Sequence, residues 1–293
     1  MRVLVTGAGG LLGGRLAAIL HARGLEVLAA HRRTAPPPGP RPVLAELTDD
    51  AALARLLDAL RPDAVVHAAV IGRADECEAR PDEAERVNAR LPGTLARLCR
   101  ERSVRLVALS TDLVLAGDRP FASEQDAPGP LSVYGRTKLA GEEAVLREAP
   151  ESAVARVALV AGRGHGARRT STESVLRALR LGHPLRLFTD EYRTPIDPES
   201  VADAVFRLLV RGGSGRFHLG GSERLSRYAL GLAVARAFGL PESAVDPGRQ
   251  SDHAGPERRA ADVSLDSTRA RRELGWEPRP LDQAIREGRP EAA

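Results

Sequence analysis

The strongest constraint on the fold is the N-terminal order of a short apolar run, a glycine-rich turn and a helical pattern. The run Val3 to Thr6 is typical of a buried strand, and the leucines that follow the turn repeat at helical spacing up to Gly24. Glycines at such a junction permit a tight turn and let the backbone approach a pyrophosphate, while the helix N-terminus offers free N–H groups to the phosphates. The segment therefore predicts dinucleotide binding through Gly7, Gly10 and Gly13.

Apolar runs then alternate with helical patterns through the first half of the chain. Strands are expected at 25–30, 64–69 and 104–111, helices at 50–60 and 92–102, and a proline-rich loop at 35–42. This alternation predicts an α/β fold with a doubly wound parallel sheet of the Rossmann type.

The second half has shorter elements and more glycine and proline. A sixth strand is expected at 155–162, and a helix at 226–240 with a serine at its start. We interpret 1–155 as a dinucleotide-binding domain to which 196–220 returns. The segments 156–195 and 221–293 are then a smaller, interleaved substrate-binding lobe.

The end of the second expected strand bears on the choice of cofactor. An acid there is typical of NAD, whereas an arginine suits the 2′-phosphate of NADP. The chain has Arg32 and Arg33 and no acid at this point, although a basic loop that is merely solvated would have the same sequence. NADP(H) is therefore favoured over NAD(H).

Tyr134 and Lys138 lie four residues apart, so in a helix both side chains share one face. A nearby ammonium favours the ionised form of a phenol, which suits the pair to proton transfer. Thr111 ends the strand at 104–111, and ligands of doubly wound sheets bind beyond the carboxyl ends of the strands. Together the three residues are a candidate catalytic set.

Composition excludes several other classes of protein. Hydrophobic residues make up 43% and charged residues 28% of the 293 residues, which is typical of a soluble globular protein. The net charge of +4 comes with only 3% aromatic residues, so no nucleic-acid partner is predicted. No apolar segment is long enough to span a membrane, and the two cysteines suit a reducing compartment, so a cytoplasmic location is expected.

The chain resembles the extended short-chain dehydrogenases/reductases, and most closely the sugar-nucleotide reductases of the dTDP-4-dehydrorhamnose reductase type. The resemblance covers nearly the whole chain. It rests on the segments VTGAGGLLG, HAA, VNARLPGTLARLC, LSTDLVLAG and SVYGRTKLAGE, and on 190–205, 215–240 and 262–285.

The resemblance implies Thr111, Tyr134 and Lys138 as catalytic residues, with Tyr134 and Lys138 also contacting the cofactor. The expected cofactor contacts also include Gly7, Gly10, Leu11, Leu12, Gly13, Arg32, Arg33, Ala68, Ala69 and Val70. Substrate contacts are expected from Thr111, Asp112 and Arg193. The relatives carry tyrosine and phenylalanine where this chain has Leu113 and Leu115, which implies a sugar site with fewer polar and stacking contacts.

Two further features have two readings each, and a third gives a negative prediction. His67 ends a strand beside the expected cofactor, where a structural histidine is a commoner outcome than a base. Arg168 and Arg169 lie in a glycine-rich loop that would fold over a substrate diphosphate, or they are a solvated pair. The histidines show no paired ligand spacing, so no metal site is predicted.

The resulting hypothesis is an NADPH-dependent reductase of a small-molecule ketone, most simply the 4-keto group of a nucleotide-activated deoxysugar. Tyr134 would donate the proton. Two alternatives stay open: an epimerase or dehydratase that retains NAD, and a non-catalytic NADP-binding regulatory subunit of the kind found with methionine adenosyltransferase. The chain is expected to act alone or as a homodimer.

Overall fold

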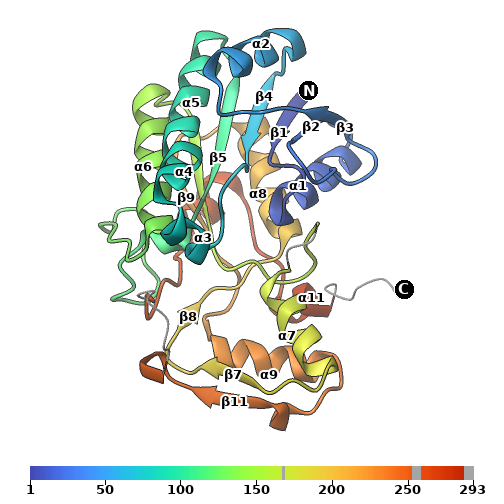
Figure 1. The fold of residues 1–293 in the computed structure, drawn as a ribbon, viewed down its shortest axis with the longest axis vertical. Helices are drawn as coiled ribbons and strands as arrows, with labels where there is room; N and C mark the ends of the chain where they lie inside the picture. Colours follow the sequence, from blue (N-terminus) through green and yellow to red (C-terminus); the bar gives the residue numbers. More distant parts are fainter. Residues whose placement is uncertain (167–168, 253–258, 287–293) are drawn as a thin grey trace.

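A seven-stranded parallel sheet forms the centre of the molecule in the computed structural model, which describes residues 1–166, 169–252 and 259–286 (Figure 1). Its strand order is β3-β2-β1-β4-β5-β6-β9, and each neighbouring pair is parallel. The strands are β1 (Arg2–Thr6), β2 (Glu26–His31), β3 (Arg41–Leu44), β4 (Ala64–His67), β5 (Arg105–Thr111), β6 (Ala153–Val157) and β9 (Gly215–Leu219). This topology confirms the predicted doubly wound fold.

Helices cover both faces of this sheet. One face packs on α1 (Leu11–Ala22), α8 (Pro198–Arg211) and α10 (Thr268–Leu274), and the other on α2 (Asp50–Leu60), α5 (Leu91–Glu101) and α6 (Val133–Glu148). Within β1, Val3 and Val5 belong to the first core, and Leu4 belongs to the second. Adjacent side chains therefore enter opposite layers, and both are apolar, as a sheet buried on two faces requires.

Two strand boundaries differ from the sequence-based prediction. Pro42, expected in a loop, lies inside β3, and this is possible because β3 is an edge strand, where a missing N–H costs no sheet hydrogen bond. The strand expected at 155–162 is β6, which covers Ala153–Val157 instead. The apolar residues that follow β6 pack between the sheet and the second half of the chain, so apolarity alone misplaced this strand.

The second half adds a smaller group of elements below the carboxyl ends of the sheet strands (Figure 1). Its core joins α7 (Ser171–Arg180), α9 (Arg227–Ala237) and α11 (Leu281–Arg286) with a parallel pair, β7 (Leu185–Phe188) and β11 (Val245–Gly248). An antiparallel pair, β8 (Tyr192–Arg193) and β10 (Leu225–Ser226), lies nearer the sheet. Between these elements the chain returns to the large sheet through α8 and β9. The exact boundaries of a substrate lobe stay a prediction.

Candidate active site

The glycine turn between β1 and α1 is closely packed. Gly7 has φ +68°, and a Cβ there would lie 2.7 Å from the Ala68 carbonyl carbon. A Cβ on Gly13 would lie 2.3 Å from the Gly7 carbonyl oxygen. Gly10 is the N-cap of α1 and provides no side-chain hydrogen bond, so the first-turn amides, which include those of Leu11 and Leu12, can bind an anion. The turn therefore has the geometry of a phosphate cradle.

Thr6 fixes the neighbouring turn after β4. Its Oγ1 accepts hydrogen bonds from the backbone N–H groups of Ala68 and Ala69 at 3.1 and 3.2 Å. The glycine turn and the segment Ala68 to Val70 are thereby held side by side at the carboxyl edge of the sheet. These are the two segments predicted to line the cofactor.

The end of β2 presents the two arginines predicted to select the cofactor. Arg32 and Arg33 are exposed, and Arg32 Nη1 lies 3.6 Å from Glu46 Oε2. An exposed pair of this kind is weak, so a phosphate can compete for the guanidinium. The basic pair is thus open to a ligand, and its role stays a prediction.

Thr111 ends β5, and Tyr134 and Lys138 lie in the first two turns of α6. Ser132 caps this helix by accepting the Gly135 N–H at 3.1 Å. A Cβ on Gly135 would lie 2.3 Å from the Leu113 carbonyl oxygen, so glycine allows α6 to pack directly on the chain that leaves β5. This contact, which the sequence reasoning missed, brings the helix carrying the tyrosine and lysine against the strand end carrying Thr111.

Lys138 is buried, and its Nζ donates to the Leu109 carbonyl oxygen at 2.8 Å. Burial lowers the pKa of Lys138 to about 8, against the opposing effect of the Glu142 carboxylate. The hydroxyl of Thr111 donates to Asp112 Oδ1 at 3.1 Å and accepts the Leu113 N–H at 3.2 Å. Burial thus brings the pKa of this amine down toward the physiological range, and the Thr111 hydroxyl is oriented by its own strand end.

Asn88, in a π-helical turn at Arg86–Arg90, ties the segment after β4 to α6. Its side chain bonds both the N–H and the carbonyl oxygen of Ile71, and its Nδ2 donates to Thr137 Oγ1 at 3.2 Å. No sequence pattern predicted a role for this asparagine. A fully buried asparagine with partners on two elements fixes the position of α6 relative to the turn after β4.

Asp112 and Arg193, both predicted to contact substrate, are brought together. Arg193 Nε lies 3.8 Å from Asp112 Oδ2, and Arg193 Nη2 lies 3.2 Å from Glu191 Oε1. Burial raises the pKa of Asp112, and the Arg193 charge opposes this rise. Arg193 is therefore largely occupied by protein partners, and its contact with substrate stays a prediction.

A loop from the second half of the chain lies against the glycine turn. The His165 N–H donates to the Leu11 carbonyl oxygen at 3.1 Å, and His165 Nε2 lies 3.2 Å from the Ala35 carbonyl oxygen. Arg169 in the same loop is exposed, and Arg168 lies outside the described residues. Sequence spacing gives no signal for these contacts, because the partners are more than a hundred residues apart.

Two kinds of feature are absent from residues 1–166, 169–252 and 259–286. No group of three or more His, Cys, Asp and Glu side chains there is placed to hold a metal ion. Nor does any helix among those residues combine the length and apolarity that a membrane crossing needs.

Comparison with known proteins gives matches along nearly the whole chain. Residues 1–290 match the family described as the RmlD substrate binding domain. The probable low-salt glycan biosynthesis reductase Agl14 of Haloferax volcanii is 31% identical over 97% of this chain and 96% of its own length. A dTDP-4-keto-6-deoxy-D-glucose reductase of Streptomyces niveus is 34% identical over 85% of this chain and 81% of its own. Methionine adenosyltransferase 2 subunit beta of Rattus norvegicus is 30% identical over 88% and 78%.

Solved structures agree with these matches. A hypothetical dTDP-4-dehydrorhamnose reductase from Sulfolobus tokodaii superposes with a TM-score of 0.85 at 30% identity, covering 96% of this chain and 98% of that one. MoeE5, solved with UDP-glucuronic acid and NAD, superposes with a TM-score of 0.83 at 26% identity over 97% and 96% of the two chains. The resemblance predicted from sequence is confirmed.

Proposed function

The chain belongs to the RmlD substrate binding domain family of sugar-nucleotide reductases, and from this premise we propose that it reduces the 4-keto group of a nucleotide-activated deoxysugar with NADPH. The proposal is supported by the placement of Thr111 at the end of β5 and of Tyr134 and Lys138 in the first two turns of α6, whose Gly135 packs against the chain that leaves β5.

The residues present fit a nicotinamide dinucleotide. Gly7 and Gly13 keep the cradle free of side chains, and the N-terminus of α1 offers N–H groups to a diphosphate. Tyr134 and Lys138 would contact the ribose and nicotinamide end, at the opposite side of the same edge. The solved relative MoeE5 was determined with NAD, which supports a nicotinamide cofactor.

When bound, NADPH supplies a hydride to the carbonyl carbon. Tyr134 donates its phenolic proton to the carbonyl oxygen, so the product is an alcohol and the tyrosine is left as a phenolate. The Thr111 hydroxyl donates a hydrogen bond to the same oxygen. In this structure that hydroxyl donates to Asp112, so the substrate's carbonyl oxygen must replace the carboxylate as its acceptor. Lys138, as a cation, stabilises the phenolate until a proton returns from solvent.

Lys138 is the only lysine among the 43 basic Lys and Arg residues of the chain. Arginine stays charged at every physiological pH, whereas an ammonium loses its proton readily when it is buried. The chain thus uses arginine for every other basic side chain and has its one amine at a buried position, where desolvation lowers the pKa to about 8. This distribution supports a chemical role for the residue.

The direct test is an NADPH-oxidation assay with dTDP- and UDP-linked 4-keto sugars and with simple ketones as controls. We expect turnover of at least one keto-sugar nucleotide and none of the simple ketones. Protein purified with stoichiometric NAD that interconverts sugar nucleotides without consuming NADPH would instead favour an epimerase. Binding of NADPH without turnover of any ketone would favour a regulatory subunit, such as the relative from Rattus norvegicus.

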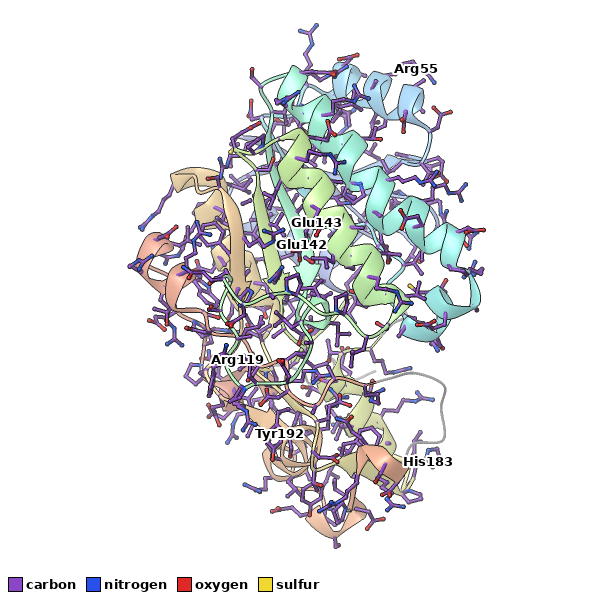
Figure 2. The ribbon with its side chains drawn as sticks, turned by 90° about the vertical axis from the view of Figure 1, so that its left-hand side faces the viewer. Arg55, Arg119, Glu142, Glu143, His183 and Tyr192 are labelled. Carbon is purple, nitrogen blue, oxygen red and sulfur yellow. The ribbon has the colours of Figure 1, made fainter. Side chains whose placement is uncertain are left out.

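The choice of NADPH depends on the arginines after β2. Replacing both Arg32 and Arg33 with alanine should raise the KM for NADPH by about 10–100-fold, because charge-assisted bonds to a 2′-phosphate are lost. The KM for NADH should hardly change. Arg55→Ala, which removes an exposed arginine on α2 (Figure 2), is the matched control. Equal losses for NADPH and NADH would contradict the assignment.

A further inference from the structure

The segment that carries Arg32 and Arg33 is held by few contacts of its own backbone. The last residue of β2, His31, still belongs to the sheet, because its carbonyl oxygen accepts the Ala45 N–H at 3.0 Å. Within the described chain, no backbone–backbone hydrogen bond involves residues 32–40, and the prolines at 36–38 have no N–H to donate. The position of the basic pair therefore depends on what fixes the chain beyond β2.

A hydrogen bond from the second half of the chain fixes this segment. His165 Nε2 lies 3.2 Å from the carbonyl oxygen of Ala35, two residues beyond Arg33. A carbonyl oxygen only accepts, so Nε2 carries a hydrogen and donates it. The two arginines are thus held by the sheet on one side and by a distant histidine on the other.

The ring of His165 packs on α1 at Gly14. A Cβ on Gly14 would lie 2.3 Å from Cδ2 and 2.8 Å from Cβ of His165, so only glycine leaves room for this side chain. The His165 N–H donates to the Leu11 carbonyl oxygen at 3.1 Å, and a Cβ on Gly166 would lie 3.0 Å from the Gly9 carbonyl oxygen. The loop 162–166 therefore packs closely on the glycine turn and on the first turns of α1.

The base of this loop is fixed to α7. The hydroxyl of Thr170 donates to the Gly162 carbonyl oxygen at 2.6 Å, and that of Thr172 accepts the Gly162 N–H at 3.0 Å. The Gly164 N–H donates to Glu173 Oε1 at 3.2 Å, and Thr170 and Glu173 also form the capping box of α7. The position of His165 is therefore determined by a helix of the second half of the chain.

We propose that His165 is a positioning residue for the choice of cofactor: by donating to Ala35 it holds Arg32 and Arg33 where they meet the 2′-phosphate of NADP(H). The inference rests on the proposed function for the role of the two arginines. It adds that the second half of the chain shares in selecting the cofactor. Without the bond the arginines keep their charge but lose their fixed position, so NADP(H) binds more weakly, while NAD(H), which has no 2′-phosphate, is little affected.

Calorimetric titration with NADP⁺ and with NAD⁺ gives the ratio of the two dissociation constants. In His165→Ala the preference for NADP⁺ should fall by about threefold to tenfold, as expected for the loss of one hydrogen bond. The side-chain amide of His165→Gln offers an N–H near the position of Nε2, so its preference should stay within about twofold of the parent. His183→Ala, which removes an exposed histidine elsewhere in the second half (Figure 2), is the matched control and should equal the parent.

Gly14→Ala tests the same contact from the side of α1. The added methyl group displaces the His165 ring, while alanine is a better helix former than glycine, so α1 itself is not weakened. We expect the same fall in preference as in His165→Ala. The double variant should show no further fall, because both substitutions remove a single contact. A parental preference in Gly14→Ala would contradict the inference.

The titrations need no ketone, so they do not depend on whether reductase activity is found. If the parent prefers NADP⁺ and His165→Ala keeps that preference, or loses affinity equally for both nucleotides, the inference is overturned and the proposed function stands. A parent that binds NADP⁺ and NAD⁺ equally would instead remove the proposed role of Arg32 and Arg33, and the inference with it.

Discussion

Replacing Tyr134 with phenylalanine is expected to lower the turnover number by about 10²–10⁴-fold, because the variant loses the proton donor to the carbonyl oxygen. The ring that packs against Ile71 and Cys77 is kept, so the fold and the cofactor cradle should be unaffected. The dissociation constant for NADPH, measured by quenching of protein fluorescence or by calorimetry, should change less than about threefold, since one uncharged hydroxyl contributes little net binding energy.

A matched control is Tyr228→Phe, which removes a phenolic hydroxyl from α9 in the core of the second half of the chain. It should retain nearly full turnover. Full activity in Tyr134→Phe would remove the tyrosine from the mechanism, whatever the substrate. A loss of NADPH binding as large as the loss of turnover would show that the residue acts in cofactor binding alone.

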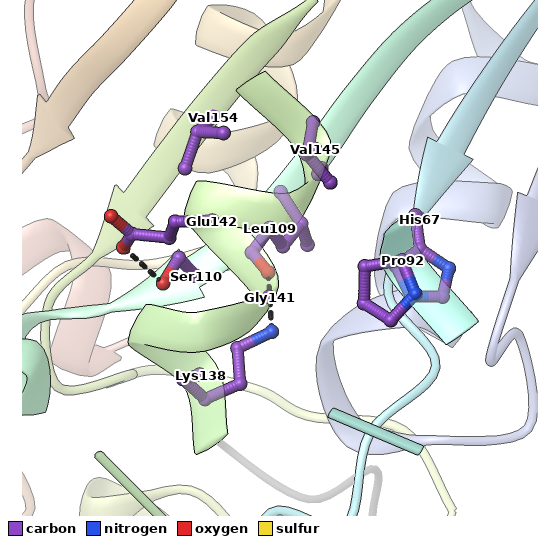
Figure 3. Close-up of a pocket in the computed structure, with 10 residues that line it drawn as sticks. His67, Pro92, Leu109, Ser110, Lys138, Gly141, Glu142, Val145 and Val154 are labelled. Atoms are coloured by element: carbon purple, nitrogen blue, oxygen red, sulfur yellow. Dashed lines mark hydrogen bonds between the residues drawn. The ribbon is translucent and has the colours of Figure 1, made fainter. Parts of the chain in front are cut away.

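The second large effect concerns the buried ion pair between Glu142 on α6 and Arg156 on β6, each 1% exposed at the side chain. Arg156 donates to both carboxylate oxygens, and Ser110 (Figure 3) and Arg216 donate to the same group. Glu142→Gln removes the charge and leaves Arg156 uncompensated in the interior. The free energy of unfolding should fall by about 3–5 kcal/mol, which is typical when one partner of a buried pair is removed.

Glu143→Gln provides the comparison, because this neighbour is exposed on the same helix (Figure 2). Urea unfolding followed by circular dichroism should place it within about 0.5 kcal/mol of the parent. Similar midpoints for Glu142→Gln and the parent would mean that the pair contributes no net stability.

The same carboxylate predicts how stability depends on pH. Burial raises the pKa of Glu142, but the hydrogen bonds and charge of Arg156 outweigh it, and the pKa lies below the usual value of 4.5. A group whose pKa is lower in the folded state contributes stability above its unfolded pKa. That contribution is lost as the pH falls below about 4.5 and through the folded pKa. Acid unfolding of Glu142→Gln should therefore be less steep than that of the parent.

The sequence was sufficient for the features that depend on local pattern. The glycine turn, the strand–helix alternation and the spacing of Tyr134 and Lys138 are each encoded within a few neighbouring residues, so the sheet and the turn between β1 and α1 were predicted correctly. One strand boundary was predicted wrongly for a physical reason. Pro42 was placed in a loop because proline disfavours inner strands, and only the sheet order shows that its strand is at the edge.

Features that depend on distant partners could not be predicted. The Asn88 bridge to α6, the Ser110–Glu142–Arg156 network and the contact of His165 with Leu11 each join residues far apart in the chain. A buried arginine within an apolar run indicates that the arginine has an acidic partner, but the run does not show which carboxylate that partner is. Likewise, only the folded structure shows that the buried His67 Nε2 has no hydrogen-bond partner among the residues that it describes.

The single lysine also makes the chain an unusual substrate for proteolysis. A protease specific for lysine has one cleavage site, the bond between Lys138 and Leu139, and this bond lies inside α6 with the lysine 5% exposed. Cleavage then requires α6 to unwind from the sheet, so its rate measures how often the helix detaches. A ligand that bridges Lys138 to the glycine turn would slow this cutting in proportion to its occupancy, and so report binding without any chromophore or turnover.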